Sequence, residues 1–260
     1  GEAALTADDA TKYLRSYEKA VDVVGQDSYP TGPRPTISIK LSALHPRYEV
    51  GNEERVMTEL FESVKSLLIK ARKVNVGITI DAEEADRLEM SLKLFEKLYR
   101  DEAVKGWGLF GLVIQAYSKR ALPVLTWIAA LAREQGDKIP LRLVKGAYWD
   151  AEIKNSQVLG LEGYPVYTRK VYTDVSYLAC AKKLLAVPSL IYPQFATHNA
   201  HTVSVILAHL GVNVEARISK FGDFPSEQLY ASDAVTENDG LVDLKFAEEG
   251  VQAVHLLLFF

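Results

Sequence analysis

The chain is poor in cysteine and has no long apolar run. Its 260 residues include one cysteine, Cys180, so an internal disulfide is excluded and we expect a reducing compartment. We expect Cys180 itself to be a small buried apolar side chain. The C-terminal apolar run, residues 255–260, is far too short to cross a bilayer and predicts a buried strand. No secretory signal is recognised.

An excess of charge of either sign is also lacking. The formal net charge is −4, and no basic stripe is interleaved with aromatic residues, so the sequence predicts no nucleic-acid partner. The chain has no low-complexity segment and no Ser/Gly-rich linker before about residue 210. We therefore expect residues 1–210 to form one domain and residues 211–260 to complete that same domain.

The chain does contain a strand pattern that occurs five times. Each apolar run ends on polar or ionisable residues, and segments with helical periodicity separate the runs. Strands that alternate with helices are parallel, and polar groups at their carboxyl ends predict one active face on a (βα) barrel or an open α/β sheet. We predict strands at residues 36–41, 76–82, 109–116, 140–147 and 192–199, and helices at residues 1–24, 53–73, 83–100, 119–134 and 171–185.

The tail is less regular than the rest of the chain. Residues 226–240 are turn-rich and acidic without a clear period, whereas residues 214–221 and 251–260 are typical of strands. We expect these two strands to complete the sheet.

The fourth strand carries a cluster of cations. Arg142 and Lys145 lie in an otherwise apolar run, and Tyr148 follows. Gly146 permits a close backbone approach to a ligand. Because charges in apolar strands are rarely without a role, the cluster predicts an anionic, planar partner: a phosphate, a carboxylate or a reduced flavin. The alternative is a pair of surface cations.

Two other strands each contribute an ionisable residue. Asp81 ends the second strand, and we expect it to be functional. The acidic residues after it favour a helix N-terminus by their charge, and are more typical of capping than of a metal site. Lys40 lies in the first strand and is either the partner of a carboxylate or a Schiff-base nucleophile.

A histidine pair follows the fifth strand. His198 and His201 have the i, i+3 spacing of some zinc ligands, but the sequence offers no third ligand at a suitable spacing, so we predict no metal site. Thr197, His198 and Asn199 lie between a strand and a helix. That position suits hydrogen bonds to a cofactor.

Together these motifs resemble the proline dehydrogenase domain of the bifunctional proline utilization A flavoenzymes. The resemblance extends from residue 1 to about residue 202. It rests on the following segments, which occur in the order of the family: GEAALT (1–6), SIKLSALHPRY (38–48), IDAEEADRLE (80–89), VIQAY (113–117), RLVKGAYW (142–149), GYPVYTRK (163–170) and YPQFATHNAHT (192–202).

The resemblance implies a (βα)8 barrel that binds FAD and oxidises L-proline to Δ1-pyrroline-5-carboxylate. Hydride would pass from proline C5 to flavin N5. Lys40 would meet the substrate carboxylate, Asp81 would support the site, Tyr148 would pack on the proline ring, and Arg142 would lie at the N5 edge. The other residues that the resemblance places around the flavin are Gln115, Lys145, Gly146, Thr168, Thr197, His198 and Asn199.

The resemblance also implies surroundings for the domain. It implies a cytoplasmic chain within a larger bifunctional protein, and a quinone as electron acceptor. A quinone acceptor would require peripheral contact with the inner membrane, although no basic amphipathic helix in the sequence indicates one.

The tail departs from the family pattern. The Arg-Arg pair that clamps the proline carboxylate in the family, and the Glu that holds the amine, are not recognisable after residue 210. The barrel is therefore either incomplete or closed by strands from outside the family pattern. Two alternatives to proline oxidation stay open: a non-catalytic flavin-binding or structural barrel, and a lyase or aldolase with Lys145 or Lys40 as its Schiff-base lysine.

Overall fold

A computed structural model describes residues 3–26, 36–197, 199–209, 241–246 and 254–259. Its strands form one seven-stranded sheet in the order β1-β2-β3-β4-β5-β7-β6. The first five strands pair in parallel in sequence order, β7 pairs in parallel with β5, and β6 pairs antiparallel with β7. The strands are β1 (Thr36–Ile39), β2 (Gly77–Ile80), β3 (Phe110–Gln115), β4 (Ile139–Val144), β5 (Ile191–Ala196), β6 (Leu241–Phe246) and β7 (Val254–Phe259).

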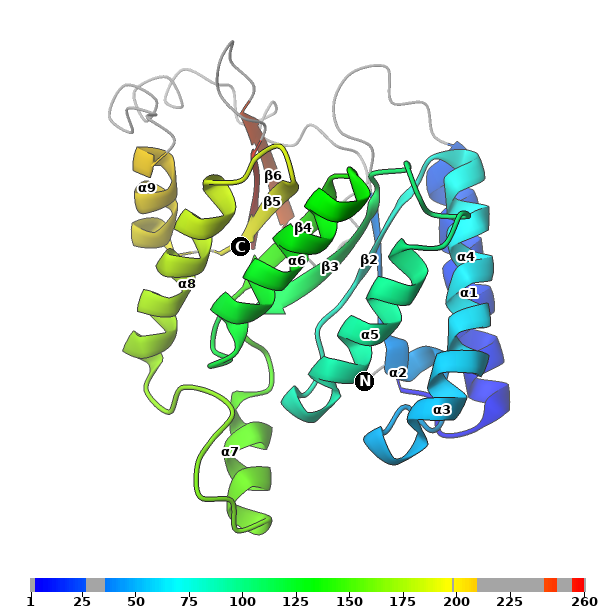
Figure 1. The fold of residues 1–260 in the computed structure, drawn as a ribbon, viewed down its shortest axis with the longest axis horizontal. Coiled ribbons are helices and arrows are strands. Elements are labelled where there is room, and N and C mark those ends of the chain that lie inside the picture. Colours follow the sequence, from blue (N-terminus) through cyan, green and yellow to red (C-terminus); the bar gives the residue numbers. More distant parts are fainter. Residues whose placement is uncertain (1–2, 27–35, 198, 210–240, 247–253, 260) are drawn as a thin grey trace.

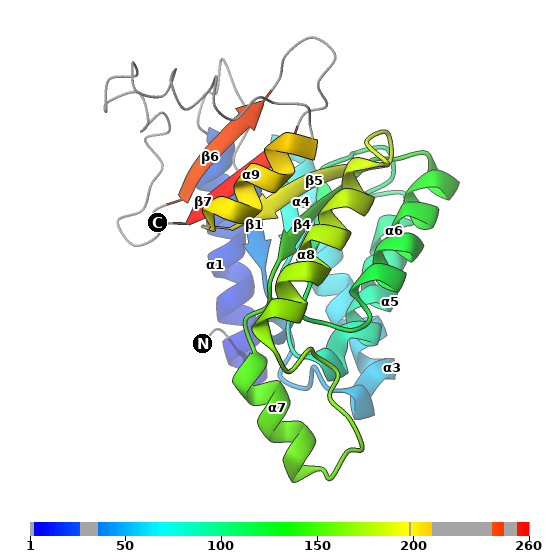
Figure 2. The ribbon, with the colours of Figure 1, turned by 90° about the vertical axis from the view of Figure 1, so that its left-hand side faces the viewer.

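Helices follow the parallel strands and cover one face of the sheet. α4, α5, α6 and α8 lie side by side in front of the strands, α1 packs against α4, and α7 projects beyond one end of the sheet (Figures 1 and 2). The longer helices are α1 (Ala7–Gln26), α4 (Phe61–Val74), α5 (Leu88–Tyr99), α6 (Ala121–Gln135), α7 (Trp149–Val158), α8 (Lys170–Leu185) and α9 (Ala200–His209). The short ones are α2 (Leu41–Leu44), η1 (Val50–Asn52), α3 (Glu53–Arg55), the π-helix η2 (Val56–Leu60) and η3 (Ala85–Arg87).

Two helix termini show how the sequence sets these bounds. Thr6 and Asp9 cap α1 reciprocally: the Thr6 hydroxyl accepts from Asp9 N, and the Asp9 carboxylate accepts from Thr6 N at 2.9 Å. α6 ends at Gly136, whose φ of 77° is the left-handed conformation typical of a helix C-terminus.

The sheet curls strongly. β1 and β4 are separated by two strands, which would hold them about 14 Å apart in a flat sheet. The Arg142 guanidinium of β4 nevertheless reaches the Ser38 hydroxyl of β1 at 3.0 Å. Sequential strand order, helices on one face and this curvature are typical of a (βα) barrel and not of a doubly wound sheet. The described strands show no pairing between β6 and β1.

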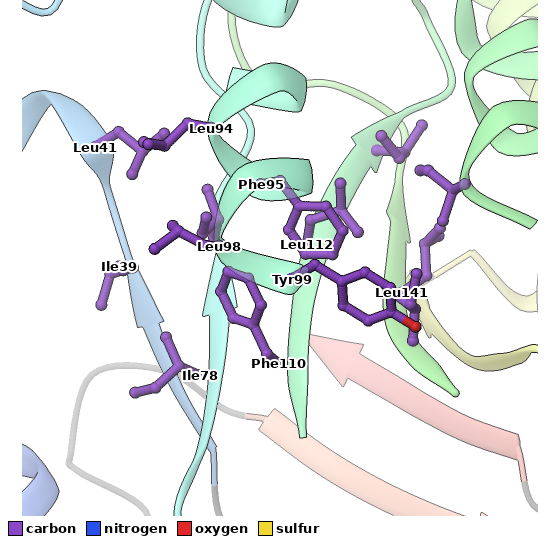
Figure 3. Packing of buried hydrophobic residues seen from close by; sticks show 14 of the residues in the cluster. Ile39, Leu41, Ile78, Leu94, Phe95, Leu98, Tyr99, Phe110, Leu112 and Leu141 are labelled. Carbon is purple, nitrogen blue, oxygen red and sulfur yellow. The ribbon is translucent and has the colours of Figure 1, made fainter. Parts of the chain in front are cut away.

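The hydrophobic core lies between the sheet and its helices. The Phe95 ring of α5 stacks on Phe110 of β3, with 4.8 Å between ring centroids, and on Tyr99. Isoleucine and leucine side chains of neighbouring strands belong to the same cluster as these rings (Figure 3). Cys180 is fully buried in this core, as predicted, and burial raises the pKa of its thiol.

Most predicted elements are confirmed. The five predicted strands correspond to β1–β5, with bounds that differ by a few residues, and the run at residues 251–260 contains β7. α7 and β6 were not predicted. α7 lacks a clear apolar stripe, which is the signal that reveals a helix. The predicted strand at residues 214–221 lies outside the described residues, and the described helices include none that is long and apolar enough to span a membrane.

Candidate active site

A cavity of about 470 Å³ lies at the carboxyl ends of β1–β5, within the size range of ligand pockets. Apolar side chains form part of its wall, and most of the predicted site residues form the rest. Predicted residues that line it are Lys40, Asp81, Gln115, Lys145, Gly146, Tyr148, Thr197 and Asn199. Lys170, which was not predicted, lines it as well.

Arg142 lies on β4 and points toward the inner side of the curled sheet. Its Nη1 donates to Ser38 Oγ at 3.0 Å and to Asp81 Oδ1 at 3.3 Å. Its Nε is buried without a hydrogen-bond partner among the described residues. Burial lowers the pKa of Arg142, and the Asp81 charge opposes this. The contact between Arg142 and Asp81 was not predicted from the sequence, and the buried Nε is a donor that a ligand could use.

Gln194 is a neighbour of Arg142 that sequence reasoning missed. It lies opposite Arg142 in the β4–β5 register, is 4% exposed, and its Oε1 has no partner within the described part of the chain. The buried Gln194 Oε1 is a hydrogen-bond acceptor and the buried Arg142 Nε is a donor, and they lie on neighbouring strands. Its only sequence signal is an uncharged polar residue between Pro193 and Phe195.

Gln115 connects the two loops that border the cavity. Its Nε2 donates to Glu83 O in the loop after β2 at 2.9 Å, and its Oε1 accepts from Ala147 N in the loop after β4 at 3.0 Å. The side chain is 7% exposed. Gln115 was predicted as a cofactor contact, and its amide is already bound at both ends to backbone, so it also fixes the shape of the pocket.

Lys145 forms an ion pair that sequence alone could not give. Its Nζ lies 2.6 Å from Asp174 Oδ1 on α8, and Lys170 Nζ lies 3.5 Å from the other oxygen of Asp174. The two cations hold the pKa of Asp174 below its usual value, the Lys145 hydrogen bond being the largest cause. One carboxylate thus holds two lysines at the rim of the cavity.

Gly146 is required for a reason other than the predicted close approach of a ligand. Its φ is 144°, and a Cβ placed on it would lie 2.7 Å from Tyr117 Cδ1 and closer still to two other ring atoms. The Tyr117 ring therefore occupies the space over this glycine. A close ligand approach to Gly146 stays a prediction.

The remaining predicted residues divide into three groups. Thr197 Oγ1 accepts from Asn199 N at 3.1 Å, and Asn199 Oδ1 accepts from Thr202 N at 2.9 Å, so Asn199 caps α9. Thr168 is exposed and is not part of the cavity wall. His198 lies outside the described residues. Among the described residues, no cluster of three His, Cys, Asp or Glu side chains could hold a metal ion.

The contact between Ser38 and Arg142 leads to a first prediction. Ser38→Ala removes one of two acceptors of the Arg142 Nη1, and hydrogen bonds to charged groups contribute more than neutral ones. Assayed with the substrate proposed below, kcat/KM should fall about tenfold because the guanidinium is less firmly held. Thr36→Ser, at the exposed start of the same strand, is the matched control. Equal kcat/KM in both variants would contradict the role of Ser38.

Comparison with known proteins identifies relatives along most of the chain. A sequence model of the family described as "Proline dehydrogenase" matches residues 1–235, which extends beyond the last motif quoted above. Bifunctional protein PutA of Klebsiella aerogenes is 60% identical over 215 residues, covering 82% of this chain and 16% of that protein. The chain thus spans about a sixth of the length of this curated relative.

Solved structures agree. A mutant of Bradyrhizobium japonicum proline utilization A matches with a TM-score of 0.78 and 51% identity, over 80% of this chain and 22% of that chain. Proline utilization A from Bdellovibrio bacteriovorus, inactivated by N-propargylglycine, matches with a TM-score of 0.77 and 28% identity, over 83% of this chain and 24% of that one.

Proposed function

Because the chain belongs to the proline dehydrogenase family, we propose that it oxidises L-proline to Δ1-pyrroline-5-carboxylate with FAD as its cofactor. One observation carries the proposal. Arg142 is a largely buried cation that contacts Asp81 of the cavity wall, and its Nε is buried and unpartnered among the described residues. A buried donor without an acceptor predicts a ligand atom that accepts from it.

The residues around the cavity suit FAD. Lys145 and Lys170 at the rim match the charge of a pyrophosphate, and Arg142 matches the electron-rich edge of a reduced flavin. Gln115 and Gly146 keep the loops after β2 and β4 in place around the pocket. When bound, the flavin would accept a hydride from proline C5 at its N5 position.

The substrate end of the pocket contains the other three predicted residues. Lys40 supplies a cation for the proline carboxylate, and Tyr148 supplies an aromatic face for the ring. Asp81 keeps Arg142 oriented from the end of β2. The residues proposed for the flavin and those proposed for proline thus lie at the same end of the sheet. They would bind and orient proline and exclude water.

A Schiff-base mechanism fits the geometry less well. A lysine nucleophile is activated by an apolar pocket or by another cation. Lys145 instead has a carboxylate, Asp174, 2.6 Å from its Nζ. Borohydride should therefore trap no adduct of Lys145.

A visible absorption spectrum tests the proposal. Purified protein reconstituted with FAD should show flavin bands near about 450 nm that bleach when L-proline is added anaerobically, because hydride reduces the flavin. D-proline at the same concentration is the control for specific binding. Bands that persist with L-proline but bleach with dithionite would refute proline oxidation and leave flavin binding intact.

The curated relative is bifunctional, and we propose that this domain works within such a longer chain. We further propose that the electrons pass to a quinone through peripheral contact with the inner membrane. The family resemblance supports this acceptor. Co-sedimentation with liposomes of anionic lipid, measured with oxidised and proline-reduced protein, tests it; no binding in either state would exclude the membrane contact.

A further inference from the structure

Glu152 is a buried carboxylate on a helix whose other first-turn acid is exposed. Its side chain is 6% exposed, whereas Asp150, also in the first turn of α7, faces solvent. Charged side chains are seldom buried without a partner. The partner here is a backbone donor: Ala85 N donates to Glu152 Oε1 at 2.6 Å.

This hydrogen bond joins two segments that border the cavity. Ala85 begins η3 in the loop that follows Asp81, and Glu152 lies one helical turn after Tyr148, whose carbonyl accepts from Glu152 N at 2.9 Å. Asp81 and Tyr148 both line the cavity. Gln115 joins the same two segments at other points, Glu83 O and Ala147 N. Glu152 is therefore a second tie between the two segments.

The surroundings of Glu152 oppose its charge. Burial raises the pKa of its carboxyl, and the nearby Asp86 and Glu84 raise it further, while the Ala85 N–H lowers it. Burial raises the pKa of the Tyr117 phenol, which follows β3, and the nearby Glu152 charge raises it further. The buried position of the Glu152 carboxyl is stabilised by the hydrogen bond from Ala85 N, so loss of this bond would also change the position of the side chain.

We propose that Glu152 is a positioning residue for substrate: through Ala85 N–H it sets the spacing of Asp81 and Tyr148 across the pocket. The inference rests on the proposed function, because it assumes that these two residues border bound proline. Arg142 is also held by Ser38 of β1, which this tie does not touch. Loss of the tie therefore weakens proline binding more than the rate of hydride transfer.

The chain allows the bond to be removed from either side. Glu152→Ala removes the acceptor. Ala85→Pro removes the donor. The backbone at this position suits proline, because Ala85 is the first residue of η3 and the preceding Glu84 is extended, with ψ of 154°. We expect each variant to raise the KM for L-proline about tenfold with kcat changed less than about threefold. The double variant should raise KM no further than either single variant, since all three lack the same bond.

Two further variants serve as controls. Glu152→Gln keeps an oxygen acceptor and should stay within about threefold of the unmodified KM, and Asp150→Ala should leave KM unchanged. A purely structural role would lower the melting temperature and the folded fraction, and so the apparent kcat, without moving KM. If KM is unchanged in Glu152→Ala and Ala85→Pro, or if the two increases in KM multiply in the double variant, the positioning role of Glu152 is overturned. The proposed function would not be affected by that result. An unmodified protein that binds FAD but does not oxidise proline would overturn the proposed function, and this inference with it.

Discussion

Arg142→Ala should lower kcat/KM for L-proline by about 10³-fold, the largest loss that we expect from a single residue. The effect is of the size that follows removal of a preorganised donor from an active site. Arg142 contributes the buried Nε that is unpartnered among the described residues, and its Nη1 also holds Asp81 in position. Anaerobic stopped-flow measurement of flavin reduction by proline tests this directly, with occupancy determined first from the flavin bands.

Two variants make the Arg142 result specific. Arg142→Lys keeps a cation but lacks the planar fork, so about a 100-fold loss is expected rather than a full rescue. Arg133→Ala, on the exposed side of α6, should change the rate less than twofold. If Arg142→Ala reduces its flavin with proline within tenfold of the unmodified rate at full occupancy, then the guanidinium does not act at the reacting atoms.

The strand-end residues could be predicted because each contrasts with its surroundings. Lys40, Asp81 and Arg142 are ionisable residues in or directly after apolar runs, and a parallel sheet brings the ends of such runs together. In the structure, Lys40 and Asp81 line one cavity and Arg142 pairs with Asp81. One ionisable residue in or after an apolar run is thus enough to predict a site residue, provided that the flanking residues clearly predict a strand.

The partners of these residues could not be predicted, because they depend on contacts between distant segments. Ser38 and Arg142 are 104 residues apart, and no local pattern links them. Asp174 lies on α8, 29 residues after Lys145, which it binds. Glu152 is at the N-terminal turn of α7, where an acidic residue ordinarily indicates a favourable helix dipole and solvent exposure. Burial of this one carboxylate is determined by the neighbouring loop, not by its own sequence.

The pairing of the strands at the β6–β7 edge of the sheet also could not be predicted from the sequence. β7 was predicted as a strand, but an apolar run carries no information on its neighbour or direction. β7 pairs in parallel with β5, and β6 adds to its other side in the antiparallel direction. A regular barrel has parallel strands only, so this antiparallel pair is a departure that no repeat of the earlier pattern could have indicated.

Gly146→Ala should destabilise the protein by about 3–4 kcal/mol, or about 10 °C in melting temperature for a domain of this size. Two causes combine: a φ of 144° strains any residue with a Cβ, and that Cβ would overlap the Tyr117 ring. Because Gly146 follows the strand that carries Arg142, we also expect flavin occupancy to fall. Thermal unfolding with and without FAD provides both measurements.

A second background separates the two causes of the Gly146 effect. In Tyr117→Ala protein the overlap is absent and the backbone strain remains, so Gly146→Ala should cost only about 1–2 kcal/mol there. Gly51→Ala is the matched control, because a Cβ at Gly51 meets no atom within 4 Å, and its melting temperature should stay within about 2 °C of the unmodified value. Equal losses for Gly146→Ala in both backgrounds would mean that the Tyr117 ring moves aside at little cost. The glycine would then be needed for its backbone conformation alone, and the space above it would be available for a ligand.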